Sequence, residues 1–202
     1  MNDEKILITG FPRSGTSVLT KFFMEMGFFI DTKWNFWDNK LNAGFENKKV
    51  SFINNLLIFS YKEIEECDYM DVVKDYISNI EDEVIKYPRF LFESKVLELW
   101  LELFPKSKII MTYREPKMVL QSKNVHAMNF PFSEQELDEK WCECFEFLQT
   151  KKIPFCCFKF PNFLNMYGDI YTILKGIGID FDKEYGRSVW DSIVDLNKVH
   201  FK

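Results

Sequence analysis

The sequence lacks the ligand spacing of a metal centre. Its five cysteines are Cys67, Cys142, Cys144, Cys156 and Cys157, and neither the Cys-x-Cys pair nor the Cys-Cys pair has the separation that zinc sites use. An odd number of cysteines without a secretory signal also argues against a disulfide framework. We therefore expect reduced thiols that are buried as small hydrophobic side chains, and no metal.

Positive charge and long hydrophobic runs are also scarce. The formal net charge is −5, and the acidic residues are scattered, so no broad positive face for nucleic acid is expected. The polar stretch Met1 to Lys5 leads into an apolar run that is too short for a signal peptide or a membrane span. We expect a cytoplasmic protein that binds no nucleic acid and holds any bound anion locally.

Hydrophobic and aromatic residues are abundant. They make up 47% and 17% of the chain, with 22 phenylalanines, which is enough for a packed interior and too much for a disordered chain. A length of 202 residues fits one domain over residues 1–202, because two domains would each be unusually small.

Short apolar runs alternate with stretches of helical periodicity along the chain. Residues 28–45 mix aromatic side chains with Asn, Asp and Gly, which favours an irregular segment. The predicted strands are Lys5–Thr9, Glu83–Tyr87, Lys108–Tyr113 and Pro154–Phe160; the predicted helices cover residues 16–26, 47–61, 68–82, 90–104, 133–150 and 162–175, and a further helix begins at Pro116. Because parallel strands need crossover connections, this order predicts an α/β fold with a parallel sheet between two helical layers.

The segment Gly10-Phe-Pro-Arg-Ser-Gly-Thr-Ser17 joins the first predicted strand to the first predicted helix. Such a turn points backbone N–H groups and the positive end of the helix at one anion. A nucleoside-triphosphatase loop would carry Lys where this chain has Thr16, and here Arg13 supplies the positive charge instead. The strand at Lys108–Tyr113 also ends in no carboxylate for magnesium, which disfavours triphosphate chemistry.

The segment resembles the 5′-phosphosulfate loop of the sulfotransferases that depend on 3′-phosphoadenosine 5′-phosphosulfate (PAPS). The resemblance implies a P-loop α/β fold in which residues Arg13, Ser14, Gly15, Thr16 and Ser17 bind the transferring end of PAPS. Arg13 would neutralise the charge that develops on the oxygen between phosphorus and sulfur.

A second resemblance lies at the end of the strand 108–113. Arg114-x-Pro116 with Ser122 eight residues after the arginine is similar to the motif that binds the 3′-phosphate in the same family. The resemblance implies that Arg114 and Ser122 hold this phosphate together. The product would be adenosine 3′,5′-bisphosphate (PAP), and no metal is required.

Transfer to a hydroxyl or amine needs a general base, and histidine is rare here. Many cytosolic members use a histidine where this chain has Pro88. Other members use a glutamate after the first helix, so Glu46 is our first candidate for the base. Asp38, His126 and Asp31 remain alternatives. Lys86 and Arg89 are further candidate anion contacts.

Two other functions remain open from the sequence. One is a P-loop kinase of a small metabolite, and the other is a non-catalytic nucleotide-binding domain that serves as an interaction partner. The acceptor of a sulfuryl group would be a small molecule, a glycan or a peptide, because the aromatic residues Trp34, Phe36 and Trp37 suit several of these equally. The sequence does not indicate an oligomeric state.

Overall fold

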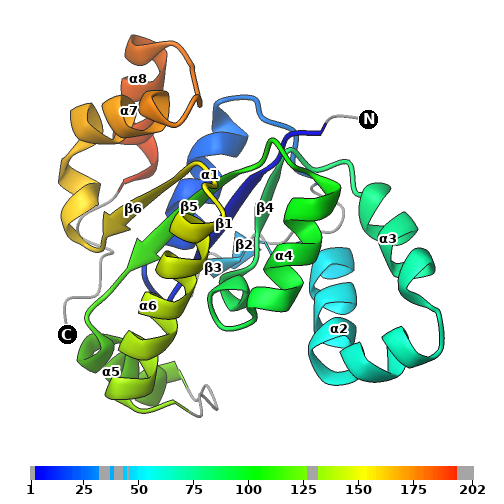
Figure 1. The fold of residues 1–202 in the computed structure, drawn as a ribbon. Coiled ribbons are helices and arrows are strands. Elements are labelled where there is room, and N and C mark those ends of the chain that lie inside the picture. Colours follow the sequence, from blue (N-terminus) through cyan, green and yellow to red (C-terminus); the bar gives the residue numbers. More distant parts are fainter. Residues whose placement is uncertain (1–2, 32–36, 39–42, 45, 127–131, 195–202) are drawn as a thin grey trace.

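A four-stranded parallel sheet forms the centre of the computed structural model, which describes residues 3–31, 37–38, 43–44, 46–126 and 132–194. Each strand pairs in parallel with its neighbours, and Leu7 lies opposite both Ile85 and Ile109. The strands, in spatial order, are β4 (Val84–Lys86), β1 (Ile6–Gly10), β5 (Lys108–Tyr113) and β6 (Phe155–Lys159) (Figure 1).

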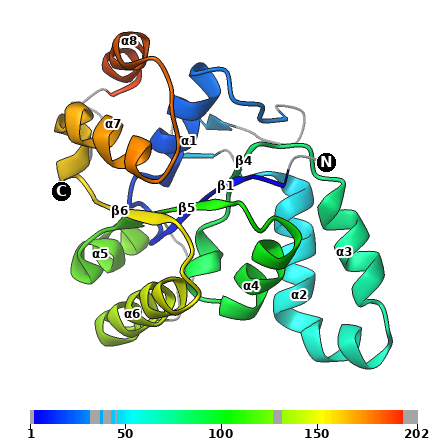
Figure 2. The ribbon, with the colours of Figure 1, turned by 45° about the horizontal axis from the view of Figure 1, so that its top comes forward.

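Helices cover both faces of this sheet, as the rotated view shows (Figure 2). One face carries α1 (Thr16–Glu25), α7 (Tyr167–Gly176) and α8 (Lys183–Ile193). The other carries α2 (Lys48–Glu66), α3 (Met70–Ser78), α4 (Ser94–Leu103), α5 (Pro116–His126) and α6 (Glu134–Thr150). The described residues also form two short 3-10 helices, η1 (Pro88–Leu91) and η2 (Asn162–Asn165).

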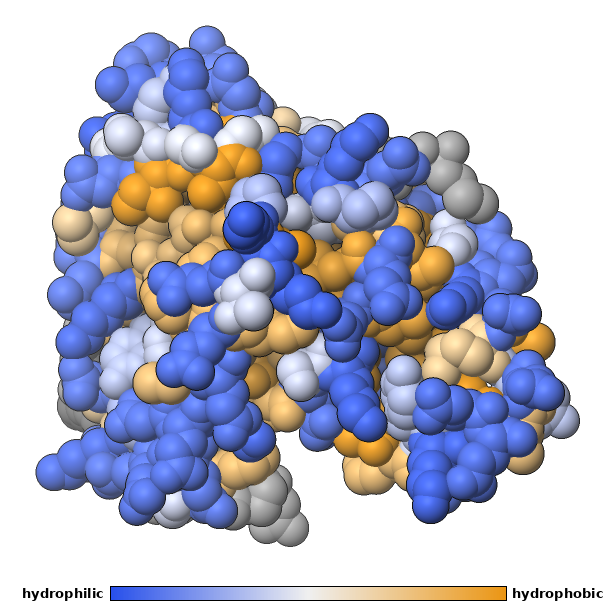
Figure 3. Space-filling model, viewed as in Figure 1, coloured by the Kyte–Doolittle hydropathy of each residue, from blue (hydrophilic) through white to orange (hydrophobic). Residues whose placement is uncertain are grey.

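The alternation of side chains along β1 divides the interior into two cores. Ile6 and Ile8 pack with α1, α7 and α8, whereas Leu7 packs with α2, α4 and α6 on the opposite face. A strand that is buried on both faces reads as a continuous hydrophobic run, which is why β1 and β5 were recognisable in the sequence. The outer faces of the helices are mostly hydrophilic, with hydrophobic surface between them in this view (Figure 3).

The predicted α/β fold with helices on both faces is confirmed, and the predicted strands match within two residues. A capping box of Ser133 and Glu136 begins α6, at the start of the helix predicted over residues 133–150. The single helix predicted over residues 90–104 is wrong at its start, because η1 precedes α4 and Glu93 between them has non-helical dihedral angles. Helix α8 was not predicted.

Residues 28–45 were predicted to be irregular, and most of them lie outside the described residues. Where the backbone is described, Trp37–Asp38 (β2) pairs antiparallel with Ala43–Gly44 (β3). All five cysteines are free. Cys144 and Cys156 are buried as predicted, but the prediction of buried thiols is wrong for the exposed Cys67, Cys142 and Cys157. The described part of the chain contains no helix long and apolar enough to cross a membrane and no cluster of three metal-binding side chains.

Candidate functional site

Two glycines fix the path of the loop between β1 and α1, which we call the phosphate loop (Gly10–Ser17). Gly10 has a φ of 148°, and a Cβ atom there would lie 2.2 Å from Thr112 Oγ1. Gly15 has a φ of 89°, and its Cβ would lie 2.7 Å from the ring of Phe163. Only glycine fits these two positions, because a side chain would clash and the backbone conformations are unfavourable for other residues.

The phosphate loop ends at the N-terminus of α1. The first N–H groups of a helix have no acceptor within the helix and carry the positive end of its dipole. Thr16 and Ser17 stand in this first turn, with exposed fractions of 4% and 9%. Burial lowers the pKa of Arg13 from its ordinary value, but an arginine remains charged throughout the physiological range.

Ser14 has a different place from its neighbours in the loop. Its side chain is fully buried, and its hydroxyl contacts the carbonyl of Phe11 and the hydroxyl of Thr112. Its N–H donates to Phe11 O at 3.2 Å. These contacts stabilise the shape of the loop from inside, so a role for Ser14 in donor binding would be indirect in this conformation.

Arg114 follows β5 and packs directly behind the phosphate loop. It is 5% exposed, it donates from Nη1 to Arg13 O at 2.9 Å, and its guanidinium lies 5.2 Å from the centre of the Phe160 ring. Burial, and then the charge of Arg13, lower the pKa of Arg114. The buried guanidinium of Arg114 and the half-buried Arg13 therefore share one region.

The Nε atom of Arg114 is buried without a hydrogen-bond partner, and no carboxylate among the described residues forms an ion pair with this side chain. A buried donor that lacks an acceptor is costly, and a bound anion would supply one. Ser122 is half-buried on α5. No hydrogen bond joins it to Arg114 in the described structure. The orphaned donor fits the phosphate that the sequence motif implies.

Lys86, the last residue of β4, connects the phosphate loop with Glu46. Its Nζ lies 3.0 Å from Ser17 Oγ, 2.6 Å from Gly44 O and 3.1 Å from Glu46 Oε1. The lysine is 5% exposed. Burial lowers its pKa, the Glu46 carboxylate opposes this, and Arg13 adds to the lowering. The half-exposed carboxylate of Glu46 is thus held beside the first turn of α1.

The start of α2 keeps Glu46 in this position. The side chain of Asn47 caps α2 by accepting from the N–H of Lys49 at 2.8 Å and donates to the buried carboxylate of Asp82. Asp82 also accepts from the N–H of Asp31 at 2.6 Å. Burial raises the pKa of Asp82, while the hydrogen bonds from Asp31 and Asn47 lower it.

The other candidate bases have different positions. Asp31 lies near Asp82, whose carboxylate accepts from the Asp31 N–H. The side chains of Asp38 and His126 lie outside the described residues, as do Trp34 and Phe36. Of the candidates, Glu46 is the one that the described structure brings to the phosphate loop.

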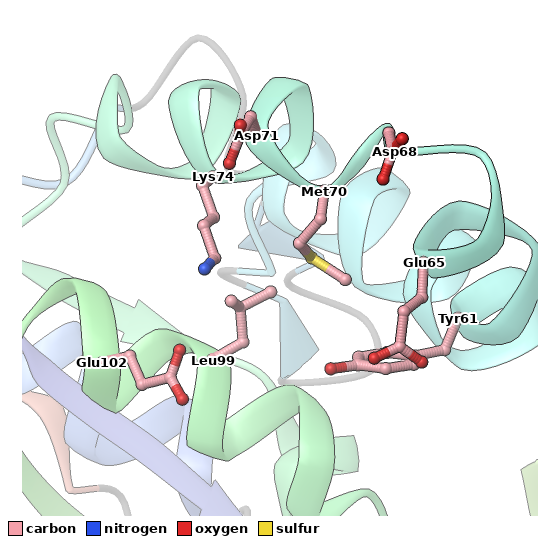
Figure 4. A pocket seen from close by; sticks show the side chains of 8 residues that line it. All are labelled: Tyr61, Glu65, Asp68, Met70, Asp71, Lys74, Leu99 and Glu102. Atoms are coloured by element: carbon pink, nitrogen blue, oxygen red, sulfur yellow. The ribbon is translucent and has the colours of Figure 1, made fainter.

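A separate cavity lies between α2, α3 and α4 (Figure 4). Its walls carry the carboxylates of Glu65, Asp68, Asp71 and Glu102, with Lys74 as the one positive charge among the described lining residues. This excess of negative charge is unsuited to a sulfated nucleotide. The phosphate loop therefore remains the candidate anion site.

Comparison with known proteins decides the family. The family model described as "Sulfotransferase domain" matches residues 3–158. The chain belongs to the sulfotransferase domain family. Its reaction is sulfuryl transfer with PAPS as co-substrate, and the predicted family is confirmed. The kinase alternative is not supported.

Solved structures similar to this sulfotransferase carry the same family name. The sulfotransferase domain of the Synechococcus PCC 7002 olefin synthase is 15% identical with a TM-score of 0.53, covering 98% of this chain and 83% of that one. The sulfotransferase domain of the curacin biosynthetic pathway is 17% identical, with a TM-score of 0.48 and coverage of 89% and 75%. The similarity to the Synechococcus domain supports the α/β fold described above.

Retinol dehydratase, in complex with androsterone and inactive cofactor PAP, is 13% identical with a TM-score of 0.46, covering 96% of this chain and 64% of that one. The comparison with curated protein sequences found no match.

Sequence reasoning missed the central position of Lys86. It named this residue only as a further anion contact, and the ion pair with Glu46 joins residues 40 positions apart. The contact of Arg114 with Phe160 and the bond between Asn47 and Asp82 were also missed. A lysine at the carboxyl end of a predicted buried strand was the signal that could have found Lys86.

Proposed function

We propose that this sulfotransferase binds PAPS along the carboxyl edge of its sheet and transfers the sulfuryl group to a hydroxyl or amine that Glu46 deprotonates. The 3′-phosphate would lie at Arg114 and Ser122. The phosphosulfate would lie on the N–H groups of residues 15–17, beside Arg13. The hydrogen bonds that join Lys86 to both Ser17 and Glu46 carry this proposal, because they hold a base next to the anion site.

Each group has a defined task in the transfer. The acceptor oxygen or nitrogen forms a bond to sulfur while the bond from sulfur to the 5′-phosphate oxygen breaks, and the acceptor proton passes to Glu46. Negative charge grows on the departing oxygen, where Arg13 and the start of α1 stabilise it. Lys86 lies near enough to assist, since it contacts Ser17 in the same turn. The products are the sulfated acceptor and PAP.

The proposal also covers the cellular location, the domain organisation and the acceptor. We place the protein in the cytoplasm, which suits its five free cysteines, and treat residues 1–202 as one domain. The acceptor is a small molecule, a glycan or a peptide.

Replacing Glu46 tests the assignment of the base. Glu46→Gln keeps the shape and a hydrogen-bond acceptor for Lys86 but cannot take a proton. We expect kcat to fall between about a hundredfold and ten-thousandfold, the range for a general base, with PAP affinity nearly unchanged. Release of PAP from PAPS, followed with a panel of hydroxyl and amine acceptors, measures kcat. A Glu46→Gln enzyme with normal kcat excludes this carboxylate as the base.

A further inference from the structure

The order of charged groups along the sheet separates a donor side of the site from an acceptor side. Arg114 follows β5, the phosphate loop follows β1, and Lys86 ends β4, which is the edge strand of the sheet. On the proposed function, PAPS extends from β5 to β1 and presents sulfur toward β4. The acceptor must then approach from beyond β4.

Arg89 lies on this acceptor side. It belongs to η1, which directly follows β4 and begins two residues after Lys86. Thr9 anchors the start of η1 by donating from Oγ1 to Pro88 O at 3.0 Å. Since the N–H of Tyr87 also donates to Ile8 O at 3.0 Å, Arg89 lies at the carboxyl ends of β1 and β4, three residues after Lys86.

The guanidinium of Arg89 is held in place by α2. Nη1 donates to Asn55 Oδ1 at 2.8 Å, and the hydroxyl of Tyr87 donates to the same oxygen at 3.0 Å. Tyr87 is buried. Because one amide oxygen has two lone pairs, these bonds saturate it and fix the direction in which Asn55 points.

Arg89 and Glu46 both influence the buried hydroxyl of Tyr87. The pKa of Tyr87 is raised to about 12, because burial raises it most, Arg89 opposes this, and Glu46 and Glu93 add to the rise. Arg89 forms no ion pair with Glu46 or Glu93 in the described structure. Its side chain is exposed, and the described residues give it one hydrogen-bond acceptor, Asn55, for five N–H donors.

A guanidinium that is fixed on one side and open on the other suits an oxyanion, because its paired N–H groups match two oxygen atoms of a carboxylate or phosphate. We infer that Arg89, positioned by Asn55, binds an anionic group of the acceptor, so that the natural acceptor carries a carboxylate or phosphate near the hydroxyl or amine that receives the sulfuryl group. This inference rests on the proposed function and adds the chemical class of the acceptor.

The test uses matched acceptors that differ in charge. The carboxylate arm compares para-hydroxyphenylacetate and a hydroxy fatty acid with their methyl esters, and the phosphate arm compares a hexose phosphate with the free hexose. Transfer from PAPS gives kcat and KM, and binding to the PAP-saturated protein is followed by ligand-observed NMR. The wild type is expected to favour the anionic member of at least one arm by about tenfold or more in kcat/KM.

Three variants separate recognition from folding. Arg89→Gln is expected to raise KM for the anionic acceptor about tenfold, with little change in kcat, in PAP affinity or in KM for the neutral partner. Arg89→Lys keeps the positive charge but lacks the paired N–H groups of the guanidinium, so it should retain part of the preference for anionic acceptors. Arg187→Gln removes an exposed arginine on α8 that stacks on Tyr167 and should change none of these values.

The inference is overturned if the neutral acceptors serve as well as the anionic ones, if Arg89→Gln affects both members of a pair equally, or if no anionic member binds the PAP-saturated enzyme. A wild type that binds no PAP would instead refute the proposed function, so the two failures are distinguishable.

Discussion

The donor side of the site, formed by the phosphate loop and Arg114, is shaped by tight packing of the main chain. Gly10 lies against Thr112, Gly15 lies against Phe163, and the hydroxyl of Ser14 is buried inside the loop. The acceptor side, formed by Glu46, Lys86 and Arg89, is assembled by polar side chains from three separate elements. Glu46 precedes α2, Lys86 ends β4 and Arg89 lies in η1.

This difference indicates which part of the site tolerates change. A loop whose glycines are fixed by sterics has one workable shape, which suits a donor that does not vary. Side chains that meet through hydrogen bonds can be exchanged one at a time without disturbing the sheet. Acceptor specificity is therefore expected to change on the side of η1 and α2, and donor binding to remain constant.

Among changes on the acceptor side, Lys86→Met should lower kcat more than any other except Glu46→Gln, which removes the proposed base. The variant removes the bonds to Ser17, Gly44 O and Glu46 while it keeps a similar apolar volume. We expect kcat to fall by about a hundredfold or more, the cost of losing one preorganised donor at a developing charge. Steady-state kinetics measure the effect.

The matched control is Lys108→Met, which removes a lysine paired with Glu4 at the start of β5, the opposite end of the sheet. Its kcat should remain close to that of the wild type. Equal losses in the two variants would mean that Lys86 acts through general stability and not at the site.

Asn47→Ala should loosen the support of Glu46. The substitution removes the N-cap of α2 and a donor to the buried Asp82 carboxylate. The expected loss is about 2 kcal/mol in the free energy of unfolding, measured by urea denaturation. Ser133→Ala removes the cap of α6 and should cost about 1 kcal/mol. Only Asn47→Ala should also lower kcat. Equal kcat values in the two variants would contradict the claim that Asn47 holds Glu46 in position.

A smaller effect concerns pH. Because burial lowers the pKa of Lys86 below its ordinary value of 10.5, this lysine loses its charge at a lower pH than an exposed one, and activity should fall there. The effect of Lys86 on stability has the opposite sign. Between its lowered pKa in the folded protein and 10.5, Lys86 is protonated in the unfolded chain but not in the folded one. The free energy of unfolding therefore increases as the pH rises through this range.

Comparison of wild type with Lys86→Met isolates both pH effects. The pH dependence of kcat and of urea unfolding in the two proteins should differ in this alkaline range, with opposite signs for activity and stability. Identical stability profiles would show that the lysine pKa is not lowered.

The donor side could be predicted from the sequence because its signals are local. Eight consecutive residues make the phosphate loop, and Arg114 directly follows a hydrophobic strand. The inward direction of Ser14 could not be predicted, since it depends on Thr112, which lies 98 positions away in the chain.

The acceptor side was predicted only as separate residues. Glu46, Lys86 and Arg89 were each named from the sequence, but nothing local indicates that Lys86 bridges Glu46 and Ser17 or that Asn55 holds Arg89. These contacts arise when α2 and β4 come together around a shared core. Helix α8 was missed for a related reason, because its buried residues Val189 and Trp190 are few among polar neighbours.

Calorimetric titration of PAP, beside ATP with magnesium, into the wild type and Arg114→Gln tests the donor site most directly. The account predicts micromolar binding of PAP, weaker binding of ATP, and a loss of about 2 kcal/mol in PAP affinity for the variant, the scale for a hydrogen bond to a charged group. Tight binding of ATP without a response to PAP, or equal PAP affinity in the two proteins, would contradict it.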